Sequence, residues 1–135
     1  MSRILLVDDD LGVREATALA LVQWGHEVQG AADGQAALLI ARAWRPDLVL
    51  LDIGLPGLDG FQVAAAWRQE PELGSCRIIA VSGLYREGDD ARLAALGIDQ
   101  LLSKPVNLAF LGSLLGHSAF TSGTDAMPKS NVTWR

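Results

Sequence analysis

The sequence predicts an α/β fold in which helices cover both faces of a parallel β-sheet. Short apolar runs alternate along the chain with longer stretches whose apolar residues recur at helical spacing, and five such pairs follow one another. This alternation is typical of parallel sheets, because each helix returns the chain to the starting edge of the sheet. The 135 residues, half of them hydrophobic, fit one globular domain. We expect this domain to span residues 1–117. Residues 118–135 are rich in small polar side chains and are expected to form a flexible tail.

Three of the predicted strands are runs of aliphatic residues and alanine that suit a buried strand and are too short for a helix, and the last predicted strand is the short run LLS. The second strand differs, because it alternates polar and apolar residues and is therefore expected toward an edge of the sheet. In chain order the predicted strands are residues 4–7, 26–29, 48–51, 78–81 and 101–103.

Most of the predicted helices have a start or stop signal in the sequence. Asp33 and Asn107 can begin the second and fifth helices, whereas Gly25 and Gly97 end the first and fourth. The second helix must end before Pro46, because a residue that precedes proline disfavours helical geometry. The helices are expected over residues 11–24, 33–45, 61–68, 89–96 and 107–115.

Acidic, hydroxyl and basic side chains follow four of the predicted strands, each at the carboxyl end of its strand. Asp8 and Asp9 follow the first strand, Asp52 the third, Ser82 the fourth and Lys104 the fifth. Ligands of doubly wound sheets bind beyond this edge. Carboxylates brought together there repel one another unless a cation intervenes, and their oxygens suit Mg2+ or Mn2+. The pattern predicts metal-assisted phosphoryl transfer, with Asp52 as the nucleophile and the metal, Lys104 and Ser82 stabilising the phosphoryl oxygens.

Four short motifs carry a resemblance to a known family: VDDD at residues 7–10, LDIGLPGLDG at 51–60, VSG at 81–83 and SKP at 103–105. Taken together, in this order and at these strand ends, they resemble the receiver domains of bacterial response regulators, the phosphoacceptor modules of two-component signal transduction. The similarity extends from about Arg3 to Leu115. It implies a flavodoxin-like, doubly wound sheet with the strand order 2-1-3-4-5.

The resemblance also implies a role for each acidic residue that matches. Asp52 resembles the phosphoacceptor, Asp9 the direct metal ligand, and Asp8 the ligand that acts through a water molecule. The backbone carbonyl of Gly54 would supply a further metal ligand. Asp10 matches no essential position of the family and is expected to help cap the first helix.

The switch of such a domain involves residues of the fourth and fifth strand ends. Ser82 resembles the hydroxyl residue that turns toward the phosphoryl group, Lys104 its cationic partner, and Pro105 a residue that commonly follows a cis peptide bond. Leu101 stands where many receivers have an aromatic side chain that changes its burial. Signalling is therefore expected to rely on shifts of the loop 83–89 instead.

The function implied is that of a phosphoacceptor. A histidine kinase or a histidine phosphotransfer domain would donate a phosphoryl group to Asp52 in a Mg2+-dependent reaction, and the chain would catalyse only its own phosphorylation and dephosphorylation. The changed surface would bind an unknown downstream protein. The family usually uses the face formed by the fourth helix, the fifth strand and the fifth helix, which could also support a homodimer.

Three other functions remain open. A receiver-like docking module would bind partners without phosphate. Leu101, which stands in place of the usual aromatic switch residue, is compatible with such a module. A phosphatase with an aspartyl nucleophile would need a second aspartate two residues after Asp52, where this chain has Gly54. A flavodoxin-like cofactor site would need a loop rich in glycine and hydroxyl groups after the first strand, but residues 8–10 would repel a phosphate.

Composition excludes several further classes. The net charge of −5, with eleven scattered basic residues, argues against nucleic-acid binding. No apolar stretch is long enough to span a membrane. Residues 1–3 lead into the first strand without the features of a signal peptide. A soluble cytoplasmic protein is therefore expected. The single cysteine, Cys76, excludes an intrachain disulfide and is expected in or near the core. His26 and His117 are expected at the surface.

Overall fold

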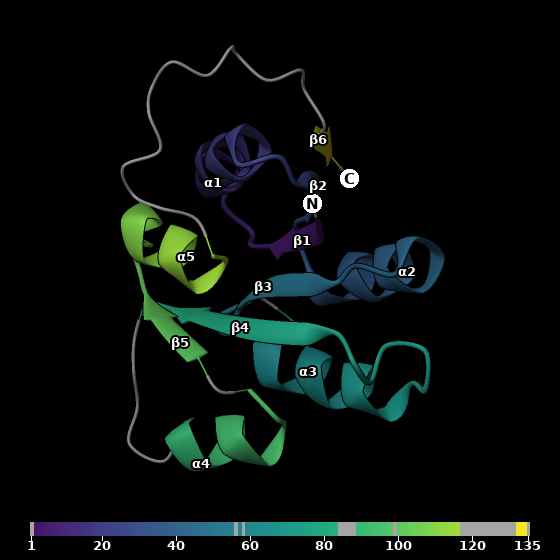
Figure 1. Cartoon of the computed structure of the whole chain (residues 1–135). Helices are drawn as coiled ribbons and strands as arrows, with labels where there is room; N and C mark the ends of the chain where they lie inside the picture. The colour runs from purple at the N-terminus through teal and green to yellow at the C-terminus, as the bar shows by residue number, and fades with distance from the viewer. Residues whose placement is uncertain are drawn as a thin grey trace.

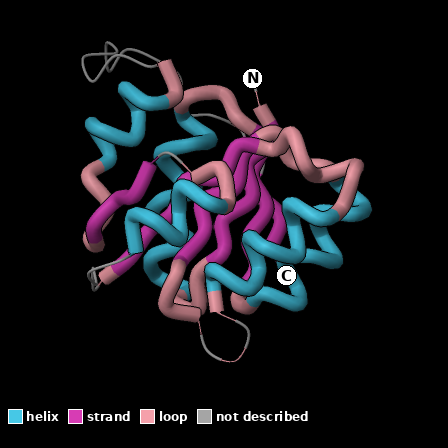
Figure 2. The backbone as a smooth tube through the Cα atoms, turned by 90° about the horizontal axis from the view of Figure 1, so that it is seen from below, coloured by secondary structure: helices cyan, strands magenta, loops and turns pink. Residues whose placement is uncertain are grey.

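Parallel strands form the centre of the structure, and helices lie on both sides of them (Figures 1 and 2). The computed structural model describes residues 2–55, 57, 59–83, 89–98, 100–116 and 132–134. The strands are β1 (Arg3–Val7), β2 (Glu27–Ala31), β3 (Leu48–Asp52), β4 (Arg77–Ser82), β5 (Gln100–Ser103) and β6 (Val132–Trp134). The helices are α1 (Leu11–Gln23), α2 (Gly34–Trp44), α3 (Gly60–Gln69), α4 (Asp89–Ala95) and α5 (Leu108–Leu114).

The order of the strands is β5-β4-β3-β1-β2-β6, and each described pair is parallel. The predicted order 2-1-3-4-5 and the single α/β domain are thereby confirmed. The sixth strand was not expected. Val132 pairs with Val28, and Trp134 with Gly30, so that β6 lies beside β2.

For residues 132–134 the structure therefore differs from the predicted flexible tail. Val, Thr and Trp all favour strands, but three residues are too few to give a periodic signal, and their partner strand is about a hundred residues away. Residues 117–131 lie outside the described part of the chain.

Two apolar layers enclose the sheet. Alternate residues of a strand point to opposite faces, so Leu5 of β1 packs with the layer under α2, α3 and α4, whereas Leu6 packs with the layer under α1 and α5. The first layer contains Trp67, which is fully buried, and the second contains Leu111. β3 is buried along its whole length. Asp52 therefore stands at the end of a rigid strand covered on both faces.

Four helices begin with the same hydrogen bond, in which an N-cap side chain accepts the N–H of the residue three positions later. The donor–acceptor distances are 2.8 to 3.1 Å. The N-cap residues are Asp10, Asp33, Asp59 and Asn107. The predicted caps at Asp10, Asp33 and Asn107 are thus confirmed. Asp10 and Asp59 also fix where the turns after β1 and β3 become helices, and those turns border the predicted site.

The other expectations about single residues have mixed outcomes. Cys76 is buried as predicted, and desolvation raises the pKa of its thiol to about 11. His26 was expected at the surface, which is wrong: it is 5% exposed and its Nδ1 accepts the backbone N–H of Ser2 at 3.1 Å. His117 lies outside the described residues. Among the residues described, no helix has the length and apolarity needed to cross a membrane.

Candidate functional site

The ends of three strands bring an ammonium group and two carboxylates into contact. Lys104 follows β5, yet its Nζ lies 2.7 Å from Oδ2 of Asp52 and 2.9 Å from Oδ2 of Asp8. Asp52 ends β3 and Asp8 follows β1, so the lysine side chain reaches past β4 to the centre of the sheet. The structure thus brings together residues that lie up to about a hundred positions apart in the sequence.

Asp9 completes a group of three carboxylates. One oxygen each from Asp8, Asp9 and Asp52 can be chosen so that all lie within 4.8 Å of one another. Asp8 and Asp52 are 6% and 4% exposed, whereas Asp9 is exposed. Lys104 offsets one of the three negative charges. The remaining formal charge and the oxygen donors fit a small divalent cation such as Mg2+, which proteins hold with a few carboxylates and water.

The carboxylates keep the lysine charged. Partial burial by itself lowers the pKa of Lys104, but the hydrogen bonds to Asp52 and Asp8 and their negative charges together outweigh it. The pKa of the amine therefore lies above its ordinary value. Lys104 is a permanent cation at neutral pH and can stabilise negative charge on a neighbouring oxygen.

Local hydrogen bonds orient the two buried acids. Oδ1 of Asp8 accepts the backbone N–H of Asp10 at 2.9 Å, and Oδ1 of Asp52 accepts the backbone N–H of Gly54 at 2.8 Å. In each carboxylate one oxygen is held by the turn that follows it, so that the other can face Lys104. Arg14 of α1, which the sequence did not indicate as a site residue, also supports this turn: its Nη1 donates to the carbonyl of Asp8 at 2.6 Å. The feature of the sequence that could have indicated this role is the position of Arg14, a basic residue one helical turn beyond the acidic motif.

Gly60 permits the close contact between α3 and the end of β3. A Cβ atom at this position would lie 2.5 Å from the carbonyl oxygen of Asp52 and 2.6 Å from Cα of Ile53. No real side chain tolerates such distances, and the N–H of Gly60 donates to the carbonyl of Ile53 at 3.1 Å. Only glycine at position 60 therefore allows α3 to pack this closely against the backbone of Asp52.

An open cleft of about 520 Å³ lies over the acidic group. Ser82, the half-buried last residue of β4, shares its wall with Asp52 and Lys104. Arg92 of α4 also lines the cleft, with its guanidinium carbon 3.6 Å from the centroid of the Phe61 ring. The sequence did not indicate Arg92 as a site residue, since nothing in its local pattern distinguishes it from a solvated helix residue.

The remaining residues of the predicted switch are also placed. Leu101 is partly buried and packs against the core layer under α2, α3 and α4. The peptide bond between Lys104 and Pro105 is cis, as the resemblance implied. Of the loop 83–89, only Gly83 and the backbone of Asp89 belong to the described residues.

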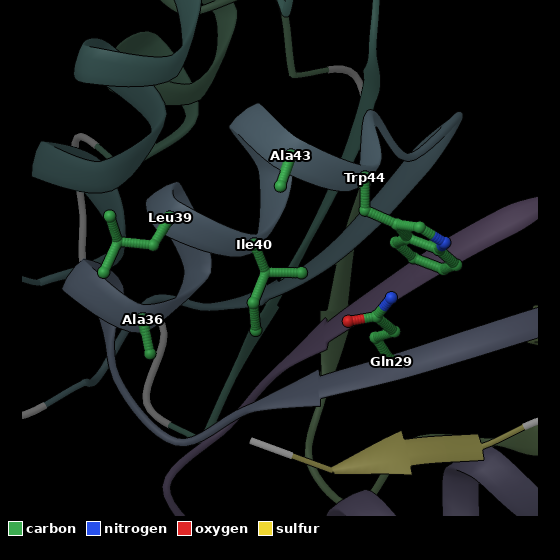
Figure 3. A pocket seen from close by; sticks show the side chains of 6 residues that line it. All are labelled: Gln29, Ala36, Leu39, Ile40, Ala43 and Trp44. Carbon is green, nitrogen blue, oxygen red and sulfur yellow. The ribbon is translucent and has the colours of Figure 1, made fainter.

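A second hollow, of about 420 Å³, lies between α2 and β2 (Figure 3). Gln29 contributes a polar side chain to a lining that is otherwise apolar: Ala36, Leu39, Ile40, Ala43 and Trp44. The described residues of this lining include no ionisable group for phosphoryl transfer. The chemistry suggested by the sequence therefore belongs to the cleft over Asp52.

The fold and the acidic cleft agree with a family match. Residues 4–115 match the response regulator receiver domain, and the chain belongs to this family. It is a receiver domain of the kind found in two-component signalling.

Particular relatives support the same assignment. The chain is 35% identical to protein PilH of Pseudomonas aeruginosa, covering 79% of this chain and 88% of PilH. It is 38% identical to the transcriptional regulatory protein AfsQ1 of Streptomyces coelicolor, covering 78% of this chain but 46% of AfsQ1, so it spans about half the length of that relative. Chemotaxis protein CheY4 of Vibrio cholerae has a similar structure, with a TM-score of 0.81, 29% identity, and coverage of 86% of this chain and 97% of CheY4.

Proposed function

We propose that this receiver domain accepts a phosphoryl group on Asp52 from a histidine kinase or a histidine phosphotransfer domain, in a reaction that requires Mg2+ or Mn2+. The observation that carries the proposal is the contact of Lys104 with two buried carboxylates, next to a third, at the edge of the sheet. Three neighbouring carboxylates with one ammonium group leave uncompensated negative charge, whose repulsion a bound divalent cation would offset.

The residues of the cleft have complementary tasks in the transfer. Asp8, Asp9 and Asp52, with the carbonyl of Gly54, would hold the divalent ion, which supplies positive charge to the phosphoryl oxygens when bound. The Asp52 carboxylate attacks phosphorus, and the bond from phosphorus to the donor nitrogen breaks as the donor histidine leaves with the electron pair. Lys104 and the hydroxyl of Ser82 bind the phosphoryl oxygens and stabilise their charge.

Signalling would follow from the added charge. Phosphorylation needs to shift the balance between two surface states by only a few kcal/mol. We infer that Ser82 and Lys104 respond first and that the surface formed by α4, β5 and α5 binds the downstream protein or a second copy of the chain. In α5, Leu108 and Phe110 are 39% and 48% exposed, which provides apolar area for such a contact.

We infer that the chain acts in the cytoplasm on protein partners and not on nucleic acid, in keeping with its net charge of −5. Its chemistry would be confined to its own phosphorylation and dephosphorylation. The phosphatase alternative lacks a general acid two residues after Asp52. Gly54 occupies that position, and its N–H binds the Asp52 carboxylate.

The test is labelling with acetyl phosphate in the presence of Mg2+, followed by intact-mass measurement. Asp52→Asn is expected to abolish the gain of one phosphoryl group, because the amide is not a nucleophile. Asp33→Asn is the matched control, since it removes the same charge from a residue that does not line the cleft and retains an N-cap residue. Labelling of Asp52→Asn at the rate of Asp33→Asn would refute the assignment of the phosphoacceptor.

A further inference from the structure

Arg92 is a second cation in the wall of the cleft. It lines the same space as Asp52, Ser82 and Lys104, although it comes from α4 and not from a strand end. Its guanidinium carbon lies 3.6 Å from the centroid of the Phe61 ring, within the range of a cation–π contact.

The stacking leaves the guanidinium able to bind an anion. Phe61 is 8% exposed and belongs to the core layer, so the ring is a fixed platform, whereas Arg92 is exposed. A guanidinium placed over a ring still has its N–H donors along its edge, in the fork that matches phosphate oxygens. Among the residues whose side chains the structure describes, no carboxylate forms an ion pair with Arg92.

The sum of the charges in the cleft indicates that a further cation is needed once Asp52 is phosphorylated. The three carboxylates carry three formal negative charges, Lys104 neutralises one, and a divalent ion would neutralise the other two. Phosphorylation of Asp52 then adds about one negative charge, because a phosphoryl group is close to dianionic at neutral pH. Asp59 also lines the cleft, but its carboxylate caps α3 by accepting the N–H of Gln62 at 2.9 Å, and the N-terminus of the helix offsets part of its charge. Among the described residues that line the cleft, Arg92 is the cation that remains to balance the phosphoryl group.

We propose that Arg92 binds the phosphoryl group, first in the phosphodonor and then on Asp52. This inference rests on the proposed function of Asp52. With acetyl phosphate as donor, a carboxylate oxygen of Asp52 forms a bond to phosphorus while the bond from phosphorus to the acetyl oxygen breaks, and acetate leaves with the electron pair. Arg92 donates N–H groups to the phosphoryl oxygens throughout, and no proton is transferred.

The competing explanation is purely structural. Arg92 would then hold α4 against α3 through the Phe61 ring and have no part in anion binding. The two explanations differ in what they expect of phosphoryl chemistry: removal of a packing contact lowers thermal stability, whereas removal of a phosphoryl ligand slows labelling and weakens the binding of a phosphoryl mimic.

The experiment compares Arg92→Ala and Arg92→Lys with the wild type in Mg2+. Two quantities are measured, the rate of labelling by acetyl phosphate below saturation and the beryllofluoride concentration that gives half of the change in amide NMR spectra. Arg42→Ala is the matched control, because Arg42 is an exposed arginine of α2 that pairs with Glu70 outside the cleft. Thermal unfolding is recorded for every variant.

Arg92→Ala is expected to slow labelling about tenfold or more and to raise the beryllofluoride requirement by a similar factor, as loss of a hydrogen bond to a charged group predicts. Arg92→Lys retains the charge but not the forked pair of donors. Its labelling rate and its beryllofluoride requirement are expected to lie between those of the wild type and of Arg92→Ala. Arg92→Ala values equal to those of Arg42→Ala, with only the unfolding temperature lowered, would overturn the role of Arg92. A wild type that neither labels nor responds to beryllofluoride would instead overturn the proposed function of Asp52 itself.

Discussion

Replacement of Lys104 by methionine tests the electrostatics of the site without any phosphodonor. The substitution keeps a long side chain and removes the ammonium group that contacts Asp8 and Asp52 at 2.9 and 2.7 Å. At these separations a single ion pair has a Coulomb energy of about 6 kcal/mol with an effective dielectric constant of about 20. The desolvation of the three groups offsets most of this energy.

The net loss can be bounded from the burial of the partners. Asp8 and Asp52 are 6% and 4% exposed, so the variant leaves two buried carboxylates beside each other without a cation. The Lys104 side chain is 26% exposed, so solvent already weakens its contribution. We expect the free energy of unfolding to fall by about 2–3 kcal/mol without divalent ions, in the range of a hydrogen bond to a charged group.

The assay is urea denaturation at neutral pH, with and without Mg2+. Three uncompensated carboxylates attract a divalent ion more strongly than a cluster that includes an ammonium group. Mg2+ is therefore expected to stabilise Lys104→Met more than it stabilises the wild type. Arg42→Met, which breaks the exposed pair with Glu70, is the control and should lose about 0–1 kcal/mol with no dependence on Mg2+. If Lys104→Met unfolds like the control, or gains no extra stability from Mg2+, the electrostatic account of the cleft is wrong.

Two further predictions concern the support of the site and the buried thiol. Gly60→Ala is expected to cost about 1–3 kcal/mol of stability and to slow Asp52 labelling, because the new methyl group would meet the Asp52 carbonyl at 2.5 Å; stability and labelling rate equal to those of the wild type would contradict this. Burial raises the pKa of the Cys76 thiol from 9.0 to about 11, so the folded state favours the protonated form and stability should fall as the pH rises from about 9 to about 11. Cys76→Ala should show a smaller fall in urea titrations over that pH range, and an identical slope would exclude the thiol as its cause.

Arg14 and Arg92 show how the site depends on helices as well as on strand ends. Arg14 holds the backbone of Asp8 from α1, and Arg92 faces the same cleft from α4. Each is one basic residue within a helix. Arg14 differs from a solvated side chain only by its place one helical turn beyond the acidic motif, and Arg92 has no such signal in the sequence. Their positions follow from the packing of helices onto the sheet, which sequence periodicity alone does not specify.

Local features were accessible from the sequence because the forces behind them act over a few residues. The apolar runs predicted the five strands of the family fold, and side chains of Asp10, Asp33 and Asn107 cap helices where expected. The placement of Asp52 and Lys104 at strand ends also predicted that they would share one edge, because parallel strands end on the same side.

Other features arise only when distant segments meet. Burial of His26 depends on the segment at Ser2, which lies beside it because β1 and β2 pair. The pairing of β6 with β2 and the stacking of Arg92 on Phe61 likewise join parts of the chain that are far apart in sequence. Sequence periodicity reports which face of an element is apolar, whereas tertiary packing decides which neighbour covers it and where a single charged side chain ends.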